Sequence, residues 1–501
     1  TINTAGTYSI SGTLSDGQII VNTNKGEKTY ILLDGVDITC KNSSPLQILS
    51  SEKTVIALGD NSENKISDGK SYDESENNPD AAIFSKEDLV FIGTGSLEVN
   101  GNYDKGIVSK DDLIIENGNI SVKSVADGIK GKDSVVIRGG KITVDAGGDG
   151  IQSYNDKEDD KGYISLEGGT IKITAGQDGI QAETNLLITD SNIDITTGGG
   201  SENSSDKEGW GNWGAKPPAR PQESKTSTSE NSTSAKAIKA GSIIELDGGK
   251  ITIDSSDDSI HSNEKIIINS GDMEMSSGDD GIHADSELEI NGGTINITKS
   301  YEGIESVKLT INDGDIHVVA SDDGLNAAGG NDTSQSAGVF GGDKFSASNG
   351  TITINGGYIV IDVAGDGVDS NGSITMTNGT VIVNGPENSG NGALDYDTTF
   401  DISGGVFVAA GNNGMVQAPS TSSSQASINV SLPSSSSNSM ASILDASGNT
   451  ILSFTPSKTY QSVVISTPEL VIGSNYSVYY GGSNSGSESD GLYTDGSASG
   501  G

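Results

Sequence analysis

The sequence predicts an all-β chain that folds as a right-handed parallel β-helix of about a dozen three-strand coils, closed by a small C-terminal β cap. Three observations support this prediction. An acid followed by Gly and Ile recurs along the chain, so that Asp280-Gly281-Ile282 returns as Glu302-Gly303-Ile304 after 22 residues. Apolar residues alternate with polar ones inside each repeat, which is the period of a strand with one buried face. The 501 residues include 69 glycines and 10 prolines, a balance that favours many tight turns.

One repeat, residues 282–303, shows how a coil is built. Residues 282–284, 287–290 and 294–297 each alternate between apolar and polar side chains, and residues 291–293 form a turn between the last two. Three strands this short cannot bury their own apolar faces. They can do so when each strand pairs with its counterparts in the coils above and below, and such parallel crossovers are right-handed in nearly all proteins.

The repeat also predicts the domains in chain order. Residues 1–417 are expected to form the β-helix, with less regular opening coils as an N-terminal cap. Two insertions, residues 198–235 and 328–349, leave the coils as long loops. Residues 418–501 are predicted to hold a small β cap over the open edge of the last coil. Their final stretch, residues 481–501, is rich in Gly and Ser and is expected to be disordered.

Acidic residues dominate the charge, with 70 acids against 29 bases and a formal net charge of −41. Such a chain repels phosphates, which argues against a nucleic-acid partner. No apolar run reaches the length of a membrane span, about 18 residues. The acidic composition, rich in Ser, Thr, Asn and Gly, favours an exported protein that is secreted or attached to the cell surface. We expect it to be a monomer.

The acids before glycine should form one column, because equivalent positions of successive coils stack. Two carboxylates ~4.8 Å apart repel by roughly 1 kcal/mol in water and by about 3.5 kcal/mol at an effective dielectric constant of 20. Bound Ca²⁺ is the simplest compensation, since it takes roughly six to eight oxygen ligands in flexible geometry. We therefore predict several calcium ions between coils. The candidate ligands are Asp149, Asp178, Asp257, Asp258, Asp279, Asp280, Glu302, Glu305, Asp322, Asp323, Asn326, Asp366 and Asp369.

Other interpretations of this column remain open. Asp before Gly is a routine choice for a turn, because Asp caps its own turn and Gly adopts positive φ. Lys236 stands where other coils have the acid, and with Lys239 it can neutralise the column without a metal. His261 and His283 should lie at the same position of adjacent coils. We expect them to be polar residues on an exposed face, with a transition-metal pair as the alternative.

The insertion at residues 198–235 contains both tryptophans of the chain, Trp210 and Trp213, in the stretch EGWGNWGAKPPARPQ. A Trp ring in a polar, glycine-rich loop offers a flat apolar face on which the C–H side of a sugar ring can lie. We therefore name these two residues as candidate carbohydrate contacts. The alternative is that the loop folds back and packs them on the β-helix.

The repeated DGI coils, the GWGNW insertion and the stretch FTPSKTYQSVVISTPELVIGSNYSVYYGG resemble a bacterial carbohydrate-binding family described as polysaccharide-lyase-like right-handed parallel β-helices. The resemblance covers essentially the whole chain. It implies a secreted or cell-surface protein that binds plant cell-wall polysaccharides, either cellulose-like or pectin-like. It also implies calcium between coils near the acidic turns.

Three functions compete on this basis. The first, which we favour, is calcium-dependent binding of a cell-wall polysaccharide, cellulose or polygalacturonate, without cleavage. The second is a calcium-dependent pectate or polysaccharide lyase, in which Lys239 would be the catalytic base, although an ion pair with the acidic column explains this lysine more simply. The third is a structural adhesin with no glycan site.

Overall fold

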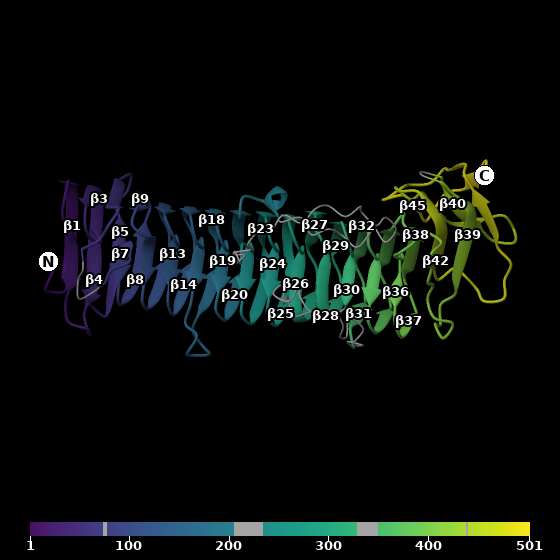
Figure 1. Ribbon diagram of the computed structural model, residues 1–501, viewed down its shortest axis with the longest axis horizontal. Helices are drawn as coiled ribbons and strands as arrows, with labels where there is room; N and C mark the ends of the chain where they lie inside the picture. The colour runs from purple at the N-terminus through teal and green to yellow at the C-terminus, as the bar shows by residue number, and fades with distance from the viewer. Residues whose placement is uncertain (74–77, 205–233, 328–348, 437–438) are drawn as a thin grey trace, which may run out of the picture. The chain divides into compact units, whose positions relative to one another are not determined.

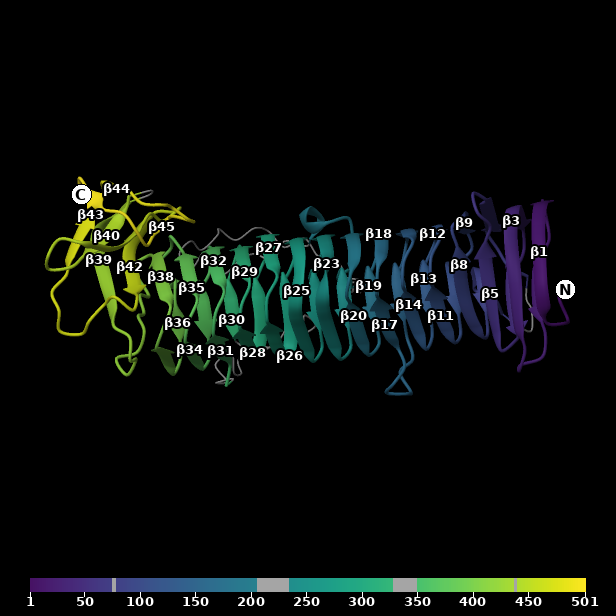
Figure 2. The ribbon, with the colours of Figure 1, turned by 180° about the vertical axis from the view of Figure 1, so that it is seen from behind.

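The computed structural model describes residues 1–73, 78–204, 234–327, 349–436 and 439–501. These residues belong to two compact units, of which the first comprises residues 1–204 and 234–279 and the second includes residues 280–501. Both units consist of stacked β-strands, and strands from successive coils of each unit lie side by side (Figure 1; Figure 2). No helix in the described ranges has the length and apolar character needed to cross a membrane.

The strands of the first unit form three columns of parallel neighbours. The first column comprises β2 (Ile19–Asn22), β4 (Leu46–Ser50), β7 (Ala81–Ser85), β10 (Lys105–Ser109), β13 (Ile129–Gly131), β16 (Ile151–Ser153), β19 (Ile180–Ala182), β22 (Ile238–Ala240) and β24 (Ile260–Ser262). The second column comprises β1 (Gly6–Leu14), β5 (Lys53–Leu58), β8 (Asp88–Gly93), β11 (Asp112–Ile115), β14 (Ser134–Ile137), β17 (Tyr163–Leu166) and β20 (Asn185–Ile188). The third column comprises β6 (Glu63–Asp68), β9 (Ser96–Gly101), β12 (Asn119–Ser124), β15 (Lys141–Ala146), β18 (Gly169–Ala175) and β21 (Ser191–Thr197). Long strands that run through both the second and the third column are β1, β3 (Lys28–Cys40), β23 (Ile243–Ser255) and β25 (Lys265–Ser277). A 3-10 turn, η1 (Ser201–Asn203), follows β21.

The core lies inside the ring of three columns. In the first column Ile129 is the register partner of Ile151, which is the partner of Ile180, and all three side chains are buried. Burial of each such side chain contributes about 1.5–3 kcal/mol relative to exposure. Stacking of identical inward positions therefore stabilises the unit, and the predicted parallel β-helix is confirmed.

The second unit repeats this arrangement. Strands β26 (Ile282–Ile290) and β28 (Ile304–Ile311) run through both its first and its second column. The first column then continues as β30 (Leu325–Ala327), β33 (Val368–Ser370) and β36 (Asp395–Tyr396). The second column continues as β31 (Thr351–Ile354), β34 (Ser373–Met376) and β37 (Thr399–Ile402). The third column comprises β27 (Thr294–Lys299), β29 (Asp315–Ala320), β32 (Tyr358–Val363), β35 (Thr380–Asn384) and β38 (Val406–Gly411).

The C-terminal strands close the second unit. β42 (Tyr460–Ser466) pairs antiparallel with β38 on one side and with β39 (Ser427–Ser436) on the other, so the predicted cap covers the edge of the last coil. A separate four-stranded sheet has the order β43 (Ser477–Tyr480), β40 (Ala441–Leu444), β41 (Thr450–Phe454) and β45 (Leu492–Tyr493) (Figure 2).

The expected disorder of residues 481–501 was wrong. β44 (Ser483–Asn484) pairs with β46 (Ala498–Ser499), and β45 pairs with β41. Leu492 is the physical reason, because it is 5% exposed and packs into the same hydrophobic core as Phe454 and Tyr460. One buried apolar side chain anchors a segment whose composition alone indicates a flexible tail.

Candidate functional site

A glycine follows the acid in most coils because the coils approach one another closely there, and the two exceptions, Ala237 and Ser259, are small buried residues. A Cβ atom on Gly150 would lie 2.5 Å from the carbonyl oxygen of Gly179 and 2.4 Å from Cγ2 of Ile173. Gly150 does not have positive φ, so the turn explanation does not apply to it. Its N–H donates to the carbonyl oxygen of Asp178 in the next coil at 2.9 Å. The acids are thereby held at equivalent positions of successive coils.

Lysines neutralise this column in the first unit. Lys239 Nζ lies 3.2 Å from Asp178 Oδ2, and Lys236 Nζ lies 3.1 Å from Asp257 Oδ1 while also contacting Asp258. Asp258 is 0% exposed. Its charge therefore depends on partners within the protein, of which Lys236 is one.

Asp149 in the first unit is held by uncharged donors. Its Oδ2 accepts a hydrogen bond from Gln152 Nε2 at 2.6 Å, and its Oδ1 accepts one from the Asp178 N–H at 3.1 Å. Burial, followed by the charges of Asp178 and Asp127, raises the pKa of the Asp149 carboxyl to about 7. The acids of this column thus repel one another as their spacing predicts.

The structure gathers most of the predicted ligands into three groups. Within each group, potential ligand atoms lie within 4.8 Å of one another. The groups are Asp257, Asp258 and Asp279 in the first unit, and Asp280, His283 and Glu305, and then Asp323, Asp366 and Asp369, in the second.

His283 supplies a positive charge in the second group. Its Nδ1 lies 3.0 Å from Asp280 Oδ2 and 3.5 Å from Glu305 Oε2, and its Nε2 lies 3.4 Å from Asp285 Oδ1. Burial lowers the pKa of His283, but these three carboxylates raise it to about 11. The expectation of an exposed face was wrong, since His283 is 3% exposed and His261 of the first unit is also buried. The sequence signal for this role is a His three residues after the acid.

Asp323, Asp366 and Asp369 form the group that lacks such a partner. Asp323 Oδ1 accepts the Asp366 N–H at 2.6 Å, and Asp366 Oδ1 accepts the Gly392 N–H at 2.5 Å. Within the described ranges, no Lys, Arg or His forms an ion pair with any of the three carboxylates. All three side chains remain partly accessible from outside, so a small ion can reach them.

The pKa values of Asp323, Asp366 and Asp369 are all raised, because these carboxylates are buried close to one another without a balancing positive charge from the described residues. Burial and the neighbouring carboxylates Asp366 and Glu302 raise the pKa of Asp323 to about 9. Burial and the charge of Asp366 raise the pKa of Asp369 to about 7, and burial is also the main reason that the pKa of Asp366 rises to about 6. A proton or a metal ion bound here would relieve the repulsion.

Asn326 adds a neutral oxygen beside this group. It is the register partner of Asp369 on one side and of Glu305 on the other, and it is 5% exposed. Its Nδ2 donates to Glu302 Oε2 at 2.7 Å, whereas its buried Oδ1 accepts no hydrogen bond. A buried amide oxygen without a donor, on the register partner of Asp369, is of the kind that ligates a hard cation. We call Asp323, Asn326, Asp366 and Asp369 the carboxylate cluster.

A family model described as carbohydrate-binding domain-containing protein matches residues 1–281 and 280–476. The chain belongs to this carbohydrate-binding family. A relative with the same description, from Acetivibrio thermocellus, is 42% identical over 126 residues, which are 25% of this chain and 44% of the relative. The chain thus spans less than half the length of that relative. A solved structure described as the polysaccharide lyase-like protein from C. thermocellum, in a gadolinium derivative, has 41% sequence identity, covers 40% of this chain and 81% of its own, and superposes with a TM-score of 0.39.

Trp210 and Trp213, the predicted carbohydrate contacts, lie outside the described residues. So do most residues of the two predicted insertion loops. Lys239, the alternative catalytic base, is held in its ion pair with Asp178 and also donates to Ser234 Oγ at 3.4 Å.

Proposed function

We propose that this chain binds an anionic cell-wall polysaccharide, of the polygalacturonate class, through Ca²⁺ held at the carboxylate cluster, and does not cleave it. The observation that carries the proposal is the group of Asp323, Asp366 and Asp369 with no ion-pair partner in the described ranges. Membership of a carbohydrate-binding family supplies the ligand class.

The residues of the carboxylate cluster fit a hard cation. Three carboxylates and the unpartnered Asn326 Oδ1 provide oxygen ligands of the kinds that Ca²⁺ prefers. Bound Ca²⁺ would supply positive charge to which the carboxylates of a uronate chain can attach. A chain with a net charge of −41 would otherwise repel a polyanion.

Binding without cleavage is favoured over lyase chemistry. A lyase needs a base that can accept a proton beside the uronate carboxylate. Lys239 is the candidate from the sequence, but its Nζ is engaged with Asp178 and Ser234. The lyase nevertheless remains the second candidate, and it makes a distinct prediction, namely an unsaturated product that absorbs ultraviolet light.

The location that suits this function is extracellular. Plant cell-wall polysaccharides lie outside the cell, and the acidic composition, poor in apolar residues, favours an exported protein. We therefore propose a secreted or cell-surface protein.

The test is binding of the whole chain to polygalacturonate in calcium and in chelator, with ultraviolet absorbance followed in the same samples. We expect retention in calcium, loss of binding in chelator, and no rise in absorbance. Asp369→Asn should weaken calcium-dependent retention, whereas Asp401→Asn, which changes an exposed acid on β37 of the same unit, should not. Retention that ignores both chelator and Asp369→Asn would contradict the proposal. A calcium-dependent rise in absorbance would make the chain a lyase.

A further inference from the structure

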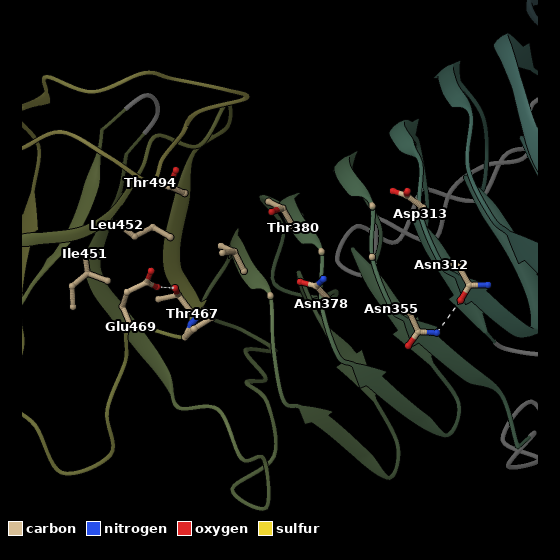
Figure 3. A pocket seen from close by; sticks show the side chains of 16 residues that line it. Asn312, Asp313, Asn355, Asn378, Thr380, Ile451, Leu452, Thr467, Glu469 and Thr494 are labelled. Carbon is tan, nitrogen blue, oxygen red and sulfur yellow. Dashed lines mark hydrogen bonds between the residues drawn. The ribbon is translucent and has the colours of Figure 1, made fainter.

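A groove of about 540 Å³ lies on the second unit, away from the carboxylate cluster. Its near wall consists of turns between the second and third columns, at residues 355–357, 378–380 and 405–406. Its far wall comes from the C-terminal strands, through residues 451–452 of β41 and residue 494 after β45 (Figure 3). The volume is within the range of small-molecule sites, about 300–1,000 Å³.

The floor of the groove is bare backbone. Gly379 and Gly405 adopt positive φ, 92° and 84°, which favours glycine at both turns. A Cβ atom on Gly379 would lie 2.7 Å from the carbonyl oxygen of Gly356 in the preceding turn. Side chains are therefore excluded from this strip, and a ligand can approach the peptide groups directly.

Polar side chains stand along the groove with their hydrogen-bonding capacity unused. Among the described residues, the side chains of Asn378, Thr380 and Thr494 form no hydrogen bond. Asn355 differs, because its Nδ2 donates to Asn312 Oδ1 at 2.9 Å and its Oδ1 accepts from Thr377 at 3.0 Å. The hydrogen bond between the amides of Asn312 and Asn355 thus links two successive turns. Asn378 lies at the next turn, and its amide forms no hydrogen bond within the described part of the chain (Figure 3).

The far wall adds an apolar surface. Ile451 and Leu452 line the groove from β41, and Val406 lines it from the first residue of β38. Leu452 is itself part of the C-terminal hydrophobic core, which holds this wall rigid. A polar row facing an apolar wall suits a ligand with hydroxyl groups on its edge and C–H groups on its face.

The charge of the groove selects against anions. None of its 16 lining residues is Lys, Arg or His, while Asp313 and Glu469 are both acidic. Carboxylates accept hydrogen bonds from sugar hydroxyls but repel a uronate. No residue of the carboxylate cluster lines the groove.

We propose that this groove is a second binding site, which takes an uncharged saccharide without calcium. It goes beyond the calcium-dependent site for an anionic glycan, and neither site depends on the other. Asn378, Thr380 and Thr494 bind the sugar hydroxyls, and the half-buried side chains of Ile451 and Val406 contact the ring face.

The test uses the full chain with two probes, cellohexaose and hexagalacturonate, each in chelator and in calcium. Saturation-transfer difference NMR with methyl irradiation detects contact of sugar C–H groups with the apolar wall, and calorimetry measures affinity. We expect cellohexaose to bind equally in chelator and calcium. The double variant Asn378→Ala/Thr494→Ala should weaken that binding about tenfold, because two hydrogen bonds are lost.

Matched variants separate the two sites. Asn475→Ala removes an exposed amide outside the groove and should leave cellohexaose binding unchanged. Thermal melting of each variant checks that it is folded, and Thr494→Ala alone provides a milder change. Cellohexaose that gives no saturation transfer, or that binds the double variant as tightly as the unchanged chain, would overturn this proposal. If hexagalacturonate fails to bind the unchanged chain in calcium while cellohexaose binds, the calcium-dependent function alone would be overturned.

Discussion

Asn326 donates its Nδ2 to Glu302 Oε2 at 2.7 Å while its own Oδ1 is buried without a donor. The two residues belong to neighbouring coils, and Asn326 is also the register partner of Asp369. One carboxylate therefore orients this amide, and its oxygen is left without a donor on the residue that pairs in register with Asp369. This relationship distinguishes the carboxylate cluster from an ordinary row of acidic turns and motivates the first prediction.

Asn326→Asp should make stability depend more strongly on calcium. In chelator we expect the free energy of unfolding to fall by about 1–3 kcal/mol, because the donor to Glu302 is lost and a further buried charge is added. Saturating calcium should restore most of this loss, since an extra carboxylate strengthens binding of a divalent cation. Urea unfolding with and without calcium measures both quantities. If calcium stabilises neither the variant nor the unchanged chain, the carboxylate cluster does not bind it.

The metal-free protein should lose stability as pH rises. The pKa values of Asp366, Asp369 and Asp323 are raised to about 6, 7 and 9, above the unfolded value of about 4. The folded chain therefore holds protons that the unfolded chain has released, and the free energy of unfolding falls between pH 4 and 9.

Melting temperatures at pH 5, 7 and 9 in chelator test this prediction. Asp323→Asn should flatten the decline, because it removes the group whose pKa is highest, and calcium should flatten it in the unchanged chain. A melting temperature that depends on pH to the same extent in Asp323→Asn as in the unchanged chain would contradict the assignment.

Lys236→Met should destabilise the first unit strongly. Removal of its Nζ deprives the buried carboxylate of Asp258 of an ion-pair partner, a change that costs about 3–5 kcal/mol in comparable buried pairs. Lys172→Met is the matched control, since its partner Asp194 is exposed and such pairs contribute about 0–1 kcal/mol. Chemical denaturation of both variants gives the comparison. Equal losses would show that Lys236 does not compensate the column.

Gly150→Ala should test the close approach of coils. The added Cβ would meet the carbonyl oxygen of Gly179 and the side chain of Ile173, and overpacking of this kind costs about 1–3 kcal/mol. Gly26→Ala is a suitable control, because nothing lies within 4 Å of its Cβ position and its φ is not positive. Thermal unfolding should therefore shift for Gly150→Ala only.

Much of the fold follows from the sequence because a β-helix is a local pattern repeated. The period of two in residues 294–297 predicts which side chains face inward, and the return of acid-Gly-Ile after 22 residues predicts which positions stack. The carboxylate cluster could be predicted for the same reason, since Asp323 and Asp366 occupy the same position of successive coils. The groove beside Asn378 was not, because its far wall comes from strands that follow the repeat.

The sequence by itself determined the architecture, the inward residues and the existence of an acidic column. Only the tertiary structure decided how each acid is balanced: Lys236 pairs with Asp257 and Asp258, His283 with Asp280, and no cation of the described ranges with Asp369. The physical reason is that charge balance depends on where flexible side chains end, within about 4 Å, and not on which backbone positions stack. Leu492 illustrates the same limit, because its burial against Phe454 orders a tail that its composition predicts to be loose.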